Sequence, residues 1–278
     1  MTAIYWGTLT LILIGMWVFL GVRALEPNLQ FGSSTRTWLE QRDPVRFVAY
    51  CALALGLLVA IGGHRYSGPL LDYVRDFYAN GATELVSIAI TILIIDRLYE
   101  RKQREHEKQR LILQLGSSHL GFATEASRLL NLHGWLTDGS VRKAYLHGTN
   151  LSRALLVAAD FQGCELSQAK FRFAALNKAN LKKAYLLAAD LSDTHLIEAN
   201  LEEATLAHAN LSRATMSGAN LVRANLQGAN MQATNLLCAN LADADLTDAD
   251  LLEAIYDQNT EWPSGFEPEM AGAILIAQ

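Results

Sequence analysis

Acidic side chains gather near one end of the repeating part of this chain, where they could bind a divalent cation. Five fall within eleven residues: Asp243, Asp245, Asp248, Asp250 and Glu253. Carboxylate oxygens are the ligands that Ca²⁺ and Mg²⁺ prefer. The same composition is typical of a solvated acidic surface, and we favour that interpretation, with no metal ion bound.

A second group of polar side chains lies inside an apolar stretch. Glu84, Ser87 and Thr91 are spaced at i, i+3 and i+7, which places them on one face of a helix. Polar residues in a membrane span usually face protein or water. We expect a helix-packing face whose hydroxyls bond to the backbone. The alternative is a polar pathway lined by several copies of the chain.

No residues are arranged for catalysis. The sequence has no glycine-rich phosphate loop after a strand, and no HExxH or GxSxG motif. His195 and His208 stand at positions expected to face solvent. Cys51, Cys164 and Cys238 are too widely spaced for a zinc site or a disulfide framework, so we expect reduced and mostly buried thiols. We therefore predict no enzyme, no catalytic or metal-binding residue and no cofactor.

Three apolar runs in the first hundred residues have lengths typical of membrane spans. They cover approximately residues 4–22, 45–63 and 82–98, and about twenty residues cross a ~30 Å hydrocarbon core. No Lys or Arg precedes the first run, which argues against its alternative, a signal peptide. The third run is the least uniformly apolar of the three, and the alternative interpretation of it is a buried helix of a soluble domain. We predict a transmembrane region over residues 1–98.

Basic residues predict the orientation of these spans. Residues 23–46 and 97–110 hold ten Lys and Arg, against two in the 64–82 loop. The positive-inside rule then places the N-terminus outside and everything after residue 98 in the cytoplasm. We therefore expect a multi-pass protein of the inner (plasma) membrane.

Residues 99–140 are predicted to be a charged helical stalk and a capping helix. Residues 96–115 contain no Gly or Pro, so we expect the third run to continue as one long helix. Its basic surface favours a solvated helix held against anionic headgroups, with a coiled coil as the alternative. Before the third run, a separate short helix is expected from Pro69 to Asn80-Gly81. The helix after Gly116 is expected to cover the open end of the region that follows.

The most specific pattern in the chain is a repeat of five residues. From Leu146 to Leu251 every fifth residue is apolar, which gives 22 repeats, and a small residue, usually Ala, stands two places earlier. Five is neither the helical nor the strand period. A backbone that turns a quarter-circle per repeat would point both residues inward and close a coil of twenty residues. The core residues expected on this basis include Leu181, Leu201, Leu221, Leu241, Ala199 and Ala219.

Residues twenty positions apart should then lie one above another. The predicted columns are an alternating charge column (Lys183, Glu203, Arg223, Asp243), two ion pairs (Lys182 with Glu202, Asp193 with Arg213) and an amide column (Asn180, Asn200, Asn220, Asn240). Stacked identical amides can form a hydrogen-bonded ladder. A coil that slipped would break all these columns together, so they are expected to fix the register.

The repeat resembles the A(D/N)LXX motif of the pentapeptide-repeat family, over about 110 residues. The resemblance implies a right-handed quadrilateral β-helix, which we place at residues 141–256. The stretch WPSGF at 262–266 is similar to the end of many such chains and implies a C-terminal cap over 257–278. The whole arrangement looks like that of bacterial membrane-anchored pentapeptide-repeat proteins.

These features predict a mixed membrane protein that acts as a non-enzymatic, membrane-anchored cytoplasmic scaffold. Its expected partners are the lipid bilayer and a protein that no motif identifies. The alternative is an oligomeric channel or transport-associated protein, with Glu84 to Thr91 lining a path and the β-helix acting as a gate or assembly platform.

A nucleic-acid partner is not expected, because the chain has a net charge of −5 and such partners require clustered Lys and Arg. The family resemblance raises one further function, since some soluble members resemble duplex DNA in size and charge and bind DNA gyrase. That function needs an anionic rod. Residues 141–200 carry eight Lys and Arg against five Asp and Glu, so this half of the repeat does not meet the requirement.

Overall fold

The computed structural model describes residue 50, residue 53 and residues 69–276. It divides the chain into two compact units, Met1–Arg104 and Glu105–Gln278. The predicted spans at 4–22 and 45–63 lie outside the described residues, apart from positions 50 and 53. Among the helices of the described residues, none combines the length and the apolar character that crossing a membrane requires. The membrane region therefore remains a prediction.

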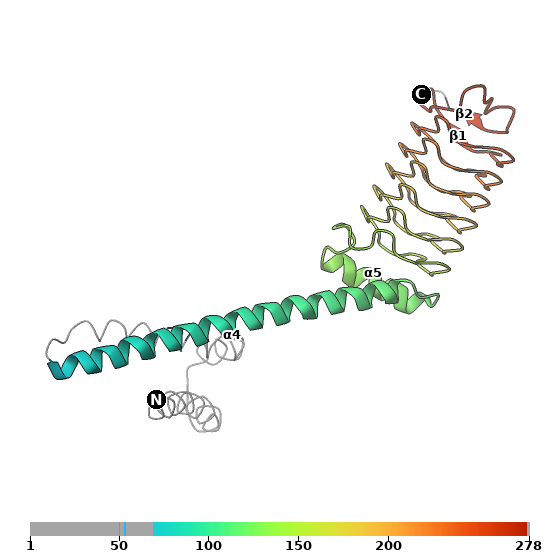
Figure 1. The fold of residues 1–278 in the computed structure, drawn as a ribbon. Helices are drawn as coiled ribbons and strands as arrows, with labels where there is room; N and C mark the ends of the chain where they lie inside the picture. Colours follow the sequence, from blue (N-terminus) through green and yellow to red (C-terminus); the bar gives the residue numbers. More distant parts are fainter. Residues whose placement is uncertain (1–49, 51–52, 54–68, 277–278) are drawn as a thin grey trace, which may run out of the picture. The chain divides into compact units, whose positions relative to one another are not determined.

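Helix α4 runs from Pro69 to Leu115 and belongs to the first unit as far as Arg104 (Figure 1). The prediction that residues 82–98 continue into the charged segment as one helix is confirmed. The prediction of a separate helix ending at Asn80-Gly81 is wrong, because α4 passes through this dipeptide. A glycine inside a helix costs only about 1 kcal/mol, which the helix-forming residues that follow can outweigh.

The repeating region folds into stacked coils of twenty residues, seen as the green-to-red rungs of Figure 1. Each coil makes four short parallel bridges to the next, at positions five residues apart, such as Asn180 with Asn200 and Tyr185 with Thr205. The bridge spacing is twenty residues until the last pair, Asn240 with Glu261, where one extra residue enters. The predicted four-sided β-helix is therefore confirmed.

The interior of the coils is filled by the repeated apolar and small residues. The six expected core residues named above are each at most 1% exposed. The inward pattern begins one repeat before Leu146, at the predicted start of the β-helix, because Val141 is fully buried and Lys143 N–H bonds to Gln162 O at 3.0 Å, as in the later coils. Where Thr replaces the small Ala, its hydroxyl donates to a backbone carbonyl, as Thr234 Oγ1 does to Leu211 O at 3.0 Å. No buried hydroxyl is then left unpaired at these positions, which keeps the substitution inexpensive.

Each corner of the coil is a tight turn with one left-handed residue. In all 22 repeats the residue two places after the inward apolar residue has a φ between 52° and 66°. A hydrogen bond closes each turn, as from Ala184 N–H to Leu181 O at 3.0 Å. A positive φ at this third position is the feature of a type II turn. Only four of these positions hold glycine, so most repeats accept a local strain of about 1–2 kcal/mol.

The Asn or Asp before each inward residue completes the hydrogen bonding of its repeat. Four of the five N–H groups in a typical repeat bond to backbone carbonyls, three of them in neighbouring coils. The fifth belongs to the residue after the inward one, and Glu202 N–H, for example, donates to Asn200 Oδ1 at 3.1 Å. All thirteen Asn and Asp at this position accept the same bond. This local bond explains why the motif prefers Asn and Asp over other polar residues.

Helices cover the first coil. Helix α5 (Leu120–Leu132) and the last residues of α4 add Leu111, Leu115 and Leu130 to the same core as the coils. Thr149 Oγ1 donates to Leu115 O at 2.5 Å, so the helix end and the first coil also share a polar contact. The structure therefore places α5 where the sequence predicts a cap.

The far end of the stack is closed by the chain that follows the repeats. Strand β1 (Ile255–Tyr256) pairs in parallel with β2 (Ile274–Leu275), at the end opposite α5 in Figure 1. The rings of Tyr256, Trp262 and Phe266 pack in sequence, with centroids 5.4 and 5.3 Å apart. These aromatic rings cover the last coil, whose open edge would otherwise invite pairing with other chains.

Candidate interaction surface

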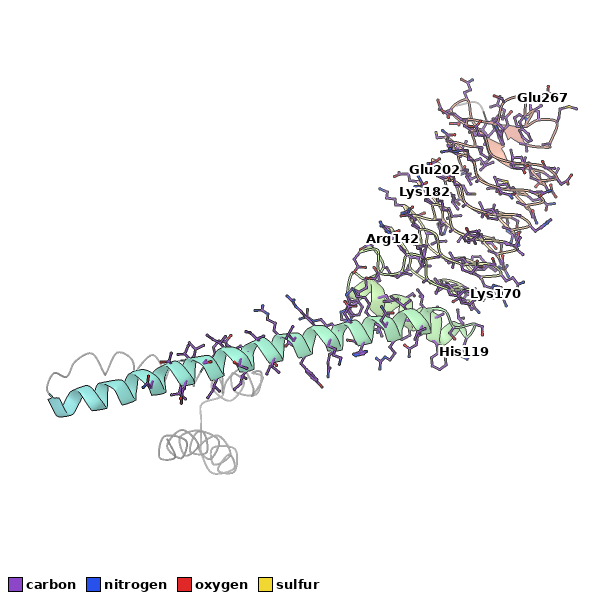
Figure 2. The ribbon with its side chains drawn as sticks, viewed as in Figure 1. His119, Arg142, Lys170, Lys182, Glu202 and Glu267 are labelled. Carbon is purple, nitrogen blue, oxygen red and sulfur yellow. The ribbon has the colours of Figure 1, made fainter. Side chains whose placement is uncertain are left out.

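The outward positions of neighbouring coils form the predicted ion pairs. Lys182 Nζ lies 2.8 Å from Glu202 Oε2, and Arg213 Nε lies 2.7 Å from Asp193 Oδ1. Figure 2 shows Arg142, Lys182 and Glu202 on different coils along one side of the stack, with Lys170 on the opposite side. These pairs are partly or fully exposed, so each contributes less than about 1 kcal/mol and together they fix the register.

The alternating column is also paired over its first three members. Glu203 contacts Lys183 at 3.3 Å and Arg223 at 3.5 Å. In the amide column, Asn220 Nδ2 donates to Asn200 Oδ1 at 3.3 Å. This is the one step of the predicted amide ladder for which the structure gives a bond. Asn180 Nδ2 donates instead to Asp160 Oδ1, and Asn240 Nδ2 donates to Glu261 Oε2.

The paired carboxyl groups are held in their charged form. The hydrogen bond from Arg213, with a further contribution from Arg172, lowers the pKa of Asp193 below its usual value. Lys182, with Arg223, lowers the pKa of Glu202 in the same way. Asp193 and Glu202 therefore keep their charges throughout the physiological pH range.

The acidic residues near the last coil belong to the turns of their own repeats. Within residues 69–276, as far as the side chains are described, no group of His, Cys, Asp or Glu is arranged to hold a metal ion. Asp245 and Asp250 instead accept backbone N–H groups of their own turns, at 3.0 and 3.1 Å. His195 and His208 are exposed on the outside of the coils. These side chains therefore serve the turns or face solvent.

The two described cysteines differ in environment. Cys164 is fully buried, and burial raises the pKa of its thiol to about 11, so it is expected to be unreactive. Cys238 is exposed, which corrects the expectation of mostly buried thiols. Its Sγ lies 3.3 Å from Asp257 Oδ2, and the hydrogen bond to this carboxylate raises its pKa. Cys51 lies outside the described residues.

The polar group on the third apolar run lies on the surface of α4. Glu84, Ser87 and Thr91 are all exposed, and Thr91 Oγ1 donates to Ser87 O at 2.8 Å. The bond of Thr91 is of the kind expected, but none of the three side chains is buried against another described element, so the helix-packing face stays a prediction. A polar pathway through several copies of the chain stays a prediction.

Exposed large apolar side chains gather on the first coils of the β-helix. They are Tyr145, Leu155, Val157, Phe173, Tyr185, Leu187 and Ile197, with exposed fractions from 37% to 76%. The next such residue along the chain is Leu252. The middle coils therefore present polar and charged columns, whereas the first coils present apolar side chains to solvent.

Basic side chains lie on the same coils as these apolar residues. Arg153 and Arg172 lie over the ring of Phe173, at 5.9 and 4.9 Å from its centroid. Lys143, Arg153 and Lys170 are exposed and form no ion pair with any residue that the structure describes. We call these four basic residues and the seven apolar residues the apolar–basic surface. It wraps around the first coils, since the bridge columns that contain Tyr145 and Leu155 are half a coil apart. Sequence reasoning missed it, although apolar residues at outward repeat positions before residue 200 are a visible signal.

Comparison with known proteins agrees with the repeat. A family model described as pentapeptide repeats matches residues 144–182, 184–223 and 224–255, with eight copies. No curated protein matches the chain.

Several solved structures are similar to parts of the chain. The pentapeptide repeat protein Rfr23 from the cyanobacterium Cyanothece 51142 is 29% identical over 48% of this chain and 99% of its own, with a TM-score of 0.34. The pentapeptide repeat protein alr5209 from Nostoc PCC 7120 is 27% identical over 53% and 95%, with a TM-score of 0.23. HetL from Nostoc sp. strain PCC 7120, a pentapeptide repeat protein involved in heterocyst differentiation regulation, is 30% identical over 43% and 68%, with a TM-score of 0.15.

The family assignment rests on the repeat motif, the coil of twenty residues and the family model, and not on these superpositions. The motif places an apolar residue at every fifth position, and the coil buries those residues in its interior. The family model covers the same stretch of the chain. By its residues 144–255, this chain is therefore a pentapeptide-repeat protein.

Proposed function

We propose that this protein is a non-enzymatic scaffold, anchored in a membrane, whose β-helix presents a rigid surface to a protein partner in the cytoplasm. The observation that carries the proposal is the apolar–basic surface on the first coils. Aromatic residues and arginines are enriched where proteins bind one another, and grouped exposed apolar residues mark such places.

The backbone of the β-helix makes this surface rigid before any partner binds. Nearly every outward side chain stands on a repeat whose N–H groups are bonded to neighbouring coils. The ring of Phe173 also lies near two guanidinium groups, those of Arg153 and Arg172. A preorganised surface loses little conformational entropy on binding, which favours affinity.

Membrane anchoring is supported by the sequence and by α4. The three apolar runs have the length of spans, and the basic residues are distributed as the positive-inside rule requires. In α4, Ile90, Ile94 and Leu98 have exposed fractions of 46%, 54% and 58%. Exposed apolar residues on a long helix fit a lipid environment.

The experiment is affinity purification of the full chain from native membranes in mild detergent, with mass spectrometry of the proteins that co-elute. The test variant carries Phe173→Ser and Leu187→Ser. The control carries Ala233→Ser and Gln227→Ser, which stand in the same two columns on later coils. We expect a partner that co-elutes with the wild type and the control and is lost from the test variant. The same proteins in all three samples, or none in any, would contradict the proposal.

A further inference from the structure

The exposed surface of α4 changes from apolar to basic along one helix face. Ile90, Ile94, Arg97, Arg101 and Arg104 are spaced at i, i+4, i+7, i+11 and i+14, which places them on the same side of the helix. All five are exposed. The first two are apolar and the other three basic, so this face changes character between residues 94 and 97.

A second face, roughly opposite, changes in the same way. Ile88, Ile95, Tyr99 and Lys102 are spaced at i, i+7, i+11 and i+14, and all are exposed. At 3.6 residues per turn, Ile88 and Ile90 point about 200° apart. Both changes fall between residues 94 and 102, which is about 12 Å of helix.

A change shared by two opposite faces indicates a planar boundary. A protein partner or a groove would contact one side of the helix and leave the other polar. A bilayer surrounds a helix, with hydrocarbon on one side of the boundary and charged headgroups on the other. Tyr99, which is 62% exposed at the boundary, is of the type found at membrane interfaces.

Three of the basic side chains at this boundary are available to a ligand. Arg97, Arg101 and Lys102 form no ion pair with other described residues, whereas Arg104 lies 3.6 Å from Glu100. Guanidinium groups bind phosphate through paired N–H donors, and an ammonium group adds a point charge.

We infer that Arg97, Arg101 and Lys102 bind the phosphates of anionic lipids, so that the protein selects anionic over zwitterionic lipid around α4. The inference rests on the proposed membrane anchoring and adds the class of lipid that the anchor recognises. Each basic residue near a membrane surface favours anionic lipid severalfold, and salt weakens the effect.

The test uses the full chain reconstituted in phosphatidylcholine vesicles that carry a trace of spin-labelled lipid. Flotation of the vesicles first measures whether the protein is membrane-associated. Electron paramagnetic resonance then measures the motionally restricted fraction of spin-labelled phosphatidylglycerol and of spin-labelled phosphatidylcholine. We expect phosphatidylglycerol to be enriched at the protein severalfold. Arg97→Gln, Arg101→Gln and Lys102→Gln together should bring the ratio close to one.

A control variant removes three positive charges elsewhere, by Arg128→Gln, Lys178→Gln and Arg223→Gln, and should keep the preference. Protein that does not float contradicts the anchoring and the inference together. Protein that floats with a ratio near one contradicts the inference alone. The inference is also overturned if the control variant, and not the α4 variant, loses the preference for phosphatidylglycerol. It is overturned as well if the α4 variant keeps the ratio of phosphatidylglycerol to phosphatidylcholine but loses a co-purifying protein, because the basic residues would then bind protein instead of lipid.

Discussion

At the scale of single residues, Asn200 shows how one side chain serves both its own turn and the next coil. Its Oδ1 accepts the N–H of Glu202 at 3.1 Å and the side-chain N–H of Asn220 at 3.3 Å. The first bond satisfies a backbone donor that the coil leaves unpaired, and the second joins two coils. The Asn or Asp of the motif therefore stabilises the fold directly.

Replacing Asn200 by Ala should lower the free energy of unfolding by about 1–2 kcal/mol, because both donors lose their acceptor. Asn200→Asp keeps the acceptor oxygen and should cost less. Urea unfolding of the full chain in detergent, followed by circular dichroism, measures both. Thr205→Ala, at an equivalent position without Asn or Asp, is the control and should change little. Equal losses for Asn200→Ala and Thr205→Ala would show that the side-chain bond does not matter.

The ion pairs predict how stability depends on pH. The lowered pKa of Asp193 in the folded state stabilises the fold above its unfolded pKa of about 4. This stabilisation is lost as the pH falls through the lowered value, because the carboxyl group becomes protonated. Arg213→Gln removes the first cause of the shift, so it should destabilise the protein by less than about 1 kcal/mol at pH 7. The difference from the wild type should disappear at low pH.

The pH dependence predicted for Arg213→Gln is checked by measuring the free energy of unfolding between pH 7 and pH 2, together with carbon NMR titration of the Asp193 carboxyl group. In Arg213→Gln its pKa should rise toward the ordinary value, though Arg172 at 3.4 Å still lowers it. Arg153→Gln removes a cation without a described acidic partner and should leave the pH profile unchanged. A destabilisation by Arg213→Gln that is the same at all pH values would rule out this linkage.

The sequence predicts the inward residues well because their identity follows the period. The two cysteines were not separated in this way, although Cys164 stands two places before an inward residue and Cys238 two places after one. The left-handed residues could not be predicted, because Lys, Glu, Ala and other types occupy that position and no residue type marks it. The role of Asn and Asp depends on which N–H the coil leaves free, which only the backbone shows.

At the scale of elements, α5 supplies the cover that the first coil needs. Its residue Leu130 is fully buried against the coils, while Leu132 in the same helix is 72% exposed. The position of this cap could be predicted, because a helical pattern directly precedes the repeats. The continuity of α4 through Asn80-Gly81 could not, because a local stop signal competes there with the helix formers that follow.

Leu130→Ala should open the cap, since removing a fully buried leucine costs about 2–5 kcal/mol. Hydrogen–deuterium exchange should then show earlier exchange of the first-coil amides, such as those of Leu146 and Asn150, while Asn200 and Asn220 stay protected. Leu132→Ala is the matched control and should leave both groups unchanged. Uniformly faster exchange along the whole β-helix would show that the coils unfold as one body and that α5 is no local cap.

At the scale of the whole molecule, a rigid β-helix and a long partly apolar helix belong to one chain. The β-helix follows from the strict five-residue period of the repeats, so the fold of residues 144–255 could be predicted from the sequence. The apolar–basic surface could not be foreseen in the same way, because its residues stand at outward positions that vary from one repeat to the next. The proposed anchor depends on apolar runs that lie largely outside the described residues.

The accessibility of Cys238 tests the anchored scaffold most directly. In a Cys51→Ser background, Cys238 is the reactive thiol, since Cys164 is fully buried with a pKa of about 11. A membrane-impermeant maleimide at pH 8 is applied to sealed right-side-out membranes and to the same membranes after opening. We predict that the protein stays with carbonate-washed membranes and that Cys238 is labelled only after opening. Labelling in the sealed membranes, or recovery of the protein in the aqueous fraction, would contradict a β-helix held at the cytoplasmic side of a membrane.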